Sequence, residues 1–159
     1  MKKLSCVLLI DDDTPTNFYN QKIIEKQACT NHIEVCTTAE DGLVFLKSKF
    51  KDGLPPQPEL IFLDLNMPGM DGWEFLDAYE ELTSPQKGKV VVVMLTTSVN
   101  TDDKNKALEK GVKGFATKPL NAEMLQSLIT ENFSRLKSHL LTISFKHLQI
   151  MLNLFYEIG

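Results

Sequence analysis

The amino-acid sequence predicts an α/β fold, with a five-stranded parallel sheet that is doubly wound by helices on both faces. Three observations support this prediction. Five apolar runs alternate along the chain with longer amphipathic stretches. The longer runs are almost uninterrupted, as is typical of strands buried on both faces. Most runs also end abruptly in polar residues, and in such sheets ligands bind beyond the carboxyl ends of the strands.

The first half of the chain contains two predicted strand–helix units. In order, its elements are a strand over Leu4–Ile10, a helix over Thr14–Gln27, a strand over Ile33–Cys36 and a helix over Ala39–Phe50. We expect Thr14 to be the N-cap of the first helix, because Pro15 then occupies the first helical position. The stretch KDGLPPQPE that follows is dense in proline and glycine, which indicates a loop.

The second half contains three more units. Its predicted elements are a strand over Leu60–Leu63, a helix over Trp73–Leu82, a strand over Val90–Leu95, a helix over Thr101–Lys110, a strand over Gly114–Thr117 and a helix over Ala122–Leu136. Asp102 and Asp103 are well placed against the positive end of their helix dipole. Asn121 precedes the last helix and is its expected N-cap.

Composition restricts the classes of function. The 159 residues are 43% hydrophobic and 24% charged, which is typical of one soluble domain with a sizeable core. A net charge of −4 and the absence of lysine or arginine runs argue against nucleic-acid and membrane partners. The three cysteines fit neither a zinc site nor a disulfide framework, which favours the reducing cytoplasm. The apolar start is cut short by aspartates and has no cleavage site, so it favours a strand over a signal peptide.

Carboxylate, hydroxyl or ammonium side chains follow four of the five predicted strands. Asp11, Asp12 and Asp13 follow the first strand, Asp64 the third, Thr96 and Thr97 the fourth, and Lys118 and Pro119 the fifth. Carboxylate oxygens are the ligands that Mg²⁺ prefers, and the ion would offset the repulsion between neighbouring carboxylates. A carboxylate beside Mg²⁺ can attack phosphorus, while a hydroxyl and an ammonium bind phosphoryl oxygens. Each feature alone is compatible with an ordinary turn or helix cap, but their joint occurrence favours a phosphoryl-transfer site.

At these residues the sequence resembles the receiver domains of two-component response regulators, of the stand-alone type. The resemblance is carried by the motifs LLIDDD, IFLDLNMPGMDGWEFL, VVVMLTTS and GFATKPL, and it covers about residues 3–136. It implies a flavodoxin-like, CheY-like sheet with strand order 2-1-3-4-5. It also implies a receiver domain over residues 1–137, followed by a C-terminal extension over residues 138–159.

The resemblance assigns the acidic residues to distinct roles. Asp64 is the implied phosphoacceptor. Asp11 and Asp12 form the implied acidic pair, with Asp12 binding Mg²⁺ directly and Asp11 mainly through water. Asn66 would offer its backbone carbonyl to the metal, and Asp13 would be a bystander at the start of the helix.

The resemblance also assigns roles around the phosphoryl group. Thr96 would contact that group, and Lys118 would form a salt bridge to it. Pro119 would be preceded by a cis peptide, which aims Lys118 inward. Gly72 would allow the sharp turn after the active-site loop. Phe115 lies at the aromatic switch position, where many members of the family have tyrosine.

The implied function is a phosphorylation-activated switch in a two-component phosphorelay. A sensor histidine kinase or a histidine phosphotransfer protein would supply the phosphoryl group, and an unidentified protein target would receive the signal. Self-phosphorylation and autodephosphorylation would be its only chemistry. One alternative is a phosphatase of the haloacid-dehalogenase type, which fits Asp11 and Asp13 but has threonine where Pro15 stands. Another is a degenerate receiver that binds partners without phosphorylation, against which the complete acceptor set argues.

The C-terminal extension carries an apolar pattern typical of a helix. Apolar residues recur at alternating steps of four and three, at Leu141, Phe145, Leu148, Leu152 and Phe155. Polar residues between them argue against a membrane span, and the segment is too short for a DNA-binding output domain. We expect either a helix that docks on the domain or pairs two chains as a homodimer, or an extension with no dedicated role.

Overall fold

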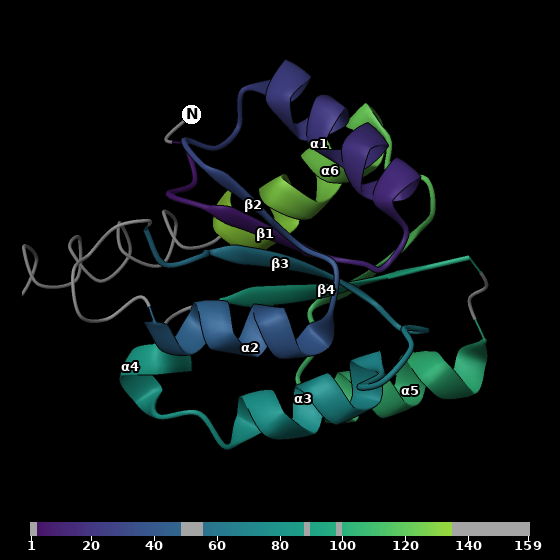
Figure 1. Ribbon diagram of the computed structural model, residues 1–159. Helices are drawn as coiled ribbons and strands as arrows, with labels where there is room; N and C mark the ends of the chain where they lie inside the picture. The colour runs from purple at the N-terminus through teal and green to yellow at the C-terminus, as the bar shows by residue number, and fades with distance from the viewer. Residues whose placement is uncertain (1–2, 49–55, 88–89, 98–99, 135–159) are drawn as a thin grey trace, which may run out of the picture. The chain divides into compact units, whose positions relative to one another are not determined.

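The computed structural model describes residues 3–48, 56–87, 90–97 and 100–134. The chain divides into two compact units, residues 1–125 and 126–159. The first unit contains a five-stranded sheet with the order β2-β1-β3-β4-β5 (Figure 1). The strands are β1 (Val7–Ile10), β2 (Ile33–Cys36), β3 (Leu60–Asp64), β4 (Val91–Thr96) and β5 (Gly114–Thr117). The predicted fold class and strand order are therefore confirmed.

All neighbouring strands pair in parallel. Val7 of β1 lies opposite Ile33 of β2 and Leu60 of β3, and Leu60 in turn lies opposite Val91 of β4. On the far side of β4, Val93 is opposite Gly114 of β5. Because every strand runs in the same direction, the carboxyl ends of all five lie along one edge of the sheet.

Helices connect the strands. They are α1 (Thr14–Gln27), α2 (Ala39–Ser48), α3 (Gly72–Glu80), α4 (Ser84–Lys87), α5 (Thr101–Glu109) and α6 (Ala122–Ile129), the last continuing into a π-helical turn at Thr130–Ser134. Helix α1 covers one face of the sheet, whereas α2, α3 and α5 cover the opposite face (Figure 1). Helix α6 begins in the first unit and ends in the second. No helix in the described part of the chain is long and apolar enough to cross a membrane.

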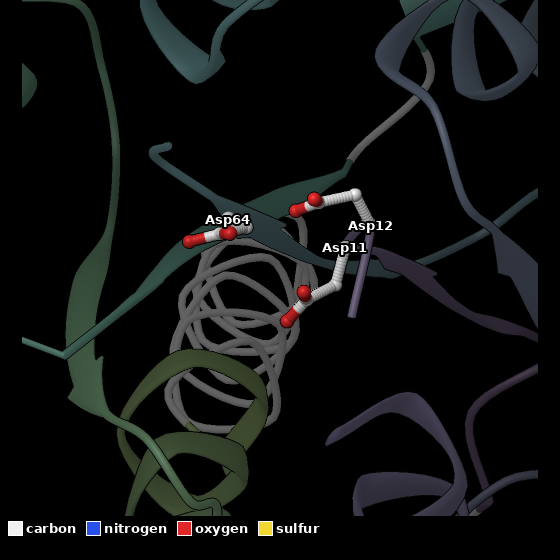
Figure 2. Close-up of side chains that lie close together, drawn as sticks. All are labelled: Asp11, Asp12 and Asp64. Atoms are coloured by element: carbon white, nitrogen blue, oxygen red, sulfur yellow. The ribbon is translucent and has the colours of Figure 1, made fainter. Parts of the chain in front are cut away.

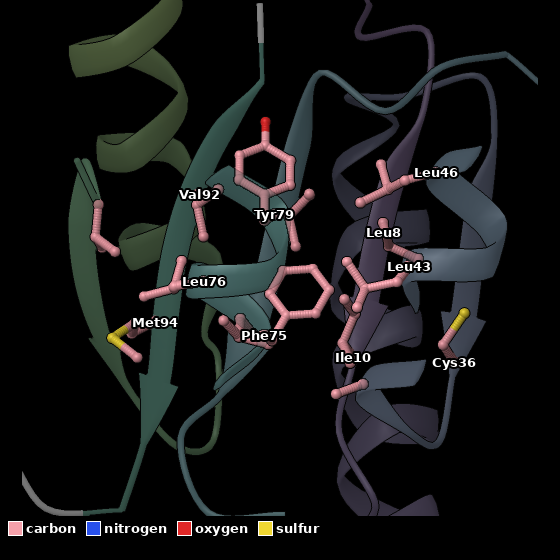
Figure 3. Packing of buried hydrophobic residues seen from close by; sticks show 14 of the residues in the cluster. Leu8, Ile10, Cys36, Leu43, Leu46, Phe75, Leu76, Tyr79, Val92 and Met94 are labelled. Carbon is pink, nitrogen blue, oxygen red and sulfur yellow. The ribbon is translucent and has the colours of Figure 1, made fainter. Parts of the chain in front are cut away.

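The main hydrophobic core lies between the sheet and helices α2, α3 and α5. Leu8 and Ile10 of β1 point into it, and so does Met94 of β4 (Figure 3). Phe75 and Tyr79, one turn apart on α3, stack with their ring planes 13° apart. Their fully or almost fully buried side chains make this layer the rigid support beneath the strand ends.

The structure corrects several local predictions. Strand β1 begins at Val7 instead of Leu4, which forms only an isolated bridge with Thr30. The N-cap of α1 is Asp13 and not Thr14, since the Asp13 carboxylate accepts a hydrogen bond from the Thr16 amide at 3.1 Å. Helix α4 was not predicted, because its four residues are too few to show a hydrophobic period.

The C-terminal prediction remains open. Asn121 caps α6 as expected, its side-chain oxygen accepting from the Met124 amide at 2.8 Å. The regular helix ends at Ile129, whereas the sequence predicted a helix to about residue 136. The predicted domain boundary at residue 137 and the extension over residues 138–159 lie outside the described residues, so both stay predictions.

Candidate functional site

Three carboxylates meet at the edge where the strands end. Asp11 and Asp12 follow β1 directly, and Asp64 is the last residue of β3. One carboxylate oxygen from each lies within 4.8 Å of those of the other two (Figure 2). Asp11 and Asp64 are buried, with 1% and 5% of their surfaces exposed, whereas Asp12 is open to solvent. No other cluster of this kind occurs in the part of the chain that the structure describes.

Lys118, just after β5, joins the two buried carboxylates. Its Nζ lies 2.7 Å from Oδ2 of Asp11 and 2.8 Å from Oδ2 of Asp64. Burial raises the pKa of Asp11, although the Lys118 ammonium acts in the opposite direction. Burial alone would lower the pKa of Lys118, but the hydrogen bonds to Asp11 and Asp64 and the negative charges of these carboxylates together raise it. Lys118 is therefore held as an ammonium ion.

The site can hold a metal ion. With the three carboxylates ionised, the Lys118 ammonium offsets only one of their charges. A hard cation would offset the remainder, and carboxylate oxygens are the donors that such a cation prefers. Asp12 leaves one side of the cluster open to solvent, so an ion can enter without displacing the core.

Thr96 ends β4 at the same edge of the sheet. It is buried, and its backbone oxygen accepts a hydrogen bond from the Lys118 amide at 2.9 Å. The peptide bond between Lys118 and Pro119 is cis. The structure thus brings together Asp11, Asp12, Asp64, Thr96 and Lys118, which the sequence singled out at four separate strand ends.

The loop after β3 contains Asn66 and ends at Gly72. Asn66 is exposed, two residues beyond Asp64. Gly72 lacks the positive φ expected of a sharp-turn glycine, which occurs instead at Gly69. A Cβ atom on Gly72 would lie only 2.6 Å from the backbone oxygen of Asp64. Gly72 therefore allows a close approach of backbone to backbone at the end of this loop, and its predicted part in a sharp turn stays a prediction.

The comparisons with known proteins agree with this geometry. The family model of the response regulator receiver domain matches residues 7–130. The chain belongs to this family. Receiver domains act in two-component signalling, typically as phosphoacceptors rather than as catalysts. A histidine kinase is the general partner of such a domain.

Three relatives are 28–33% identical to this receiver domain over the aligned residues. A crystal structure of a two-component response regulator from Cytophaga hutchinsonii is 33% identical with a TM-score of 0.76, covering 84% of this chain and 99% of that one. Response regulator Rcp1 of Synechocystis is 28% identical over 123 residues, 77% of this chain and 82% of Rcp1. Hybrid signal transduction histidine kinase I of Dictyostelium discoideum is 32% identical over 127 residues, but the match covers only 7% of that protein.

Phe115, the predicted switch residue, lies in the middle of β5. It is opposite Met94 of β4, half-buried, and packs against the main core. Phenylalanine has no hydroxyl group, so any change in its position must be read through packing alone.

Two residues near the site were not singled out from the sequence. Asn17 and Asn20 of α1 are both buried, and each hydrogen-bonds to backbone beside a charged site residue. The available signal was the helical period of residues 14–27, which places polar side chains where an inward face is normally apolar. Spacing alone could not identify their partners, because the Asn20 partner is 100 residues away in sequence and the Asn17 contact depends on how the chain turns after β1.

Proposed function

We propose that this receiver domain is a phosphorylation-activated switch that accepts a phosphoryl group on Asp64. The donor is a phosphohistidine of a sensor histidine kinase or a histidine phosphotransfer protein, and the reaction depends on Mg²⁺. The observation that carries this proposal is the contact of Lys118 with both Asp11 and Asp64 inside the acidic cluster. An ammonium ion at this position already contacts the acceptor carboxylate, so it can stabilise the negative charge that the phosphoryl group adds there.

The transfer follows from the chemistry of these groups. A carboxylate oxygen of Asp64 attacks phosphorus in line, and the phosphorus–nitrogen bond breaks with its electron pair leaving on the donor imidazole. Lys118, already 2.8 Å from Asp64, neutralises the added negative charge. Thr96 donates a hydrogen bond from its hydroxyl to a phosphoryl oxygen.

The residues that would hold Mg²⁺ are Asp11, Asp12, Asp64 and the backbone carbonyl of Asn66. The three carboxylates fit the ion because they supply hard oxygen ligands and an excess of negative charge. When bound, Mg²⁺ neutralises charge on the transferring phosphoryl group. We keep the order of roles implied by the family resemblance, with Asp12 as the direct ligand and Asp11 acting mainly through water.

Phosphorylation would then alter local packing. The new group carries up to two negative charges and draws Lys118 and Thr96 toward it. Thr96 ends the strand that precedes α5, and Phe115 packs beside that strand. The rearrangement would be read by a downstream protein partner. We also place the protein in the cytoplasm, because the number and spacing of its cysteines fit neither a zinc site nor a disulfide framework.

The test is incubation with Mg²⁺ and acetyl phosphate, followed by intact-mass spectrometry. Wild type should gain one phosphoryl group, and Asp64→Ala should gain none. Asp13→Asn is the matched control: this neighbouring aspartate caps α1, and asparagine caps equally well. An unchanged mass for wild type, or a gain in Asp64→Ala, would refute the proposal. Turnover of a phosphate ester that is lost in Asp11→Ala but kept in Asp64→Ala would favour the phosphatase alternative.

We further propose that residues 138–159 form a helical extension to a receiver domain over residues 1–137. Its regular apolar spacing fits a helix that docks on the domain or pairs two chains. Light scattering of the full chain and of residues 1–137 distinguishes these cases. A dimer only in the full chain indicates pairing. Two stable monomers exclude it.

A further inference from the structure

The buried face of α1 is polar at the end nearest the site. Only Asn17, Asn20 and Ile24 are buried in this helix, and the first two have just 3% and 0% of their surfaces exposed. A helix packed on a sheet normally presents apolar residues there. Burying an amide costs free energy unless the group is hydrogen-bonded, so these asparagines need a specific reason.

Each asparagine binds the backbone of a segment that carries a charged site residue. The Asn17 Nδ2 donates to the backbone oxygen of Asp11 at 2.6 Å. The Asn20 Oδ1 accepts from the amide of Leu120 at 3.2 Å, across 100 residues of sequence. One helix thus fixes the end of β1 and the segment after β5, whose charges meet in the ion pair of Asp11 with Lys118.

The hydrogen bond that the Leu120 amide donates to Asn20 holds the backbone on the C-terminal side of Lys118. On the other side, the Lys118 amide donates to the backbone oxygen of Thr96 at 2.9 Å. Pro119 has no N–H group, so the next backbone donor after Lys118 is that of Leu120. Asn20 accepts this hydrogen bond from inside the protein, where no water competes for it.

We propose that Asn17 and Asn20 are positioning residues of the phosphoacceptor site: Asn20 sets the place of Lys118 through Leu120, and Asn17 sets that of Asp11. This inference rests on the proposed function of Asp64. In this proposal neither asparagine touches the phosphoryl group. Their effect is on the geometry of the groups that bind it, where a displacement of about 1 Å can slow a reaction by roughly a hundredfold.

The first experiment separates positioning from stability. Asn20→Leu removes the acceptor and keeps the approximate volume. With acetyl phosphate at saturating Mg²⁺, its rate of phosphorylation should fall at least about tenfold, while Mg²⁺ affinity stays as in wild type. Asn17→Leu should instead weaken Mg²⁺ binding. Asn20→Asp keeps an acceptor oxygen and should recover most of the rate. Ile24→Ala, on the same buried face, should lose stability and keep the rate.

The second experiment does not need phosphorylation. Native-state hydrogen exchange of the Leu120 amide should be slow in wild type and Asn20→Asp and fast in Asn20→Leu, because its acceptor is then absent. If wild type accepts no phosphoryl group, the proposed function fails while exchange still tests the bond. Unchanged Leu120 protection in Asn20→Leu, or a phosphorylation rate lowered equally by Ile24→Ala, would overturn the inference.

Discussion

At Gly72, helix α3 approaches the end of β3 so closely that no side chain fits between them. A Cβ atom there would lie 2.6 Å from the backbone oxygen of Asp64 and 2.9 Å from Cα of Leu65. Both neighbours are backbone atoms of the segment that carries Asp64, and they cannot rotate away. Gly72→Ala should therefore destabilise the fold by about 2 kcal/mol, measured by urea unfolding, and should also slow phosphorylation.

Gly42 in α2 provides the matched control. Its Cβ would also lie 2.6 Å from a neighbour, but that neighbour is Cδ1 of Ile10, the end of a flexible side chain. Alanine is also the better helix former, by roughly 0.5–1 kcal/mol, which offsets part of the clash. Equal losses of stability in Gly42→Ala and Gly72→Ala would show that backbone contact is not what makes Gly72 necessary.

Tyr79 offers a test of burial by titration. Burial raises the pKa of its phenol from 10.0 to about 12, and the hydroxyl donates to the backbone oxygen of Lys87 at 3.2 Å. The folded state thus holds this proton more tightly than the unfolded state does. The resulting stability is fully present below pH 10 and is lost as pH rises through about 12. The difference in near-ultraviolet absorbance between wild type and Tyr79→Phe should titrate near pH 12. A midpoint near 10 would contradict it.

The site residues were predictable because they stand at strand ends. Parallel strands bring their carboxyl ends together, so Asp11, Asp64 and Lys118 could be placed near one another from order alone. The contact of one ammonium with both carboxylates could not be predicted, because it depends on side-chain direction. Asn17 and Asn20 were missed because their partners depend on the rotation of α1 against the sheet.

Among the elements, α5 and α3 are joined by two contacts that lysine side chains make. Ala107 is the only buried residue of α5. Lys106 places its Nζ 4.1 Å from the ring centroid of Trp73, and one turn later Lys110 forms an ion pair with Asp77. Lys110 follows Lys106, and Asp77 follows Trp73, by about one helical turn, so the two contacts lie one above the other. Because α5 follows the strand that ends in Thr96, its attachment would bear on the response to phosphorylation under the function proposed above.

The contact between Lys106 and Trp73 can be tested separately. A cation over an indole ring contributes roughly 0.5–1 kcal/mol at a partly exposed position, so Lys106→Gln should lose about that much stability. Trp73 is the only tryptophan in the chain, so its fluorescence should change at the same time. Lys104→Gln on the same helix removes an equal charge and should change neither. Identical emission spectra for wild type and Lys106→Gln would contradict the contact.

The predicted bounds of some helices and strands agree with the structure, and those of others differ. Helix α1 and strands β2 and β5 have the bounds that hydrophobic pattern and turn residues predicted. The short helix α4 carries no period, and the cap of α1 moved by one residue because Asp13 and Thr14 are both good caps. Choosing between adjacent caps requires the direction in which the chain leaves β1.

For the molecule as a whole, the acidic cluster lowers the stability of the folded state. The topology forces three carboxylates together, and a single ammonium offsets one of their charges. The repulsion between Asp64 and the Asp11–Asp12 pair acts on the folded state alone, because the unfolded chain separates β1 from β3. Metal binding and global stability are therefore linked.

If Mg²⁺ binds only the folded state, a concentration about one hundred times its Kd should stabilise wild type by about 2.7 kcal/mol. Asp12→Asn removes one of the repelling charges, so it should raise the melting temperature without metal and reduce the further rise on adding Mg²⁺. Asp13→Asn removes an equal charge outside the cluster and should keep the full response to Mg²⁺. Calorimetry of the three proteins with and without Mg²⁺ measures all of these effects. Asp12 supplies one of the three carboxylates of the cluster, so its loss should weaken Mg²⁺ binding to the folded state. If Mg²⁺ raised the melting temperature equally in wild type and Asp12→Asn, the metal would have to bind elsewhere.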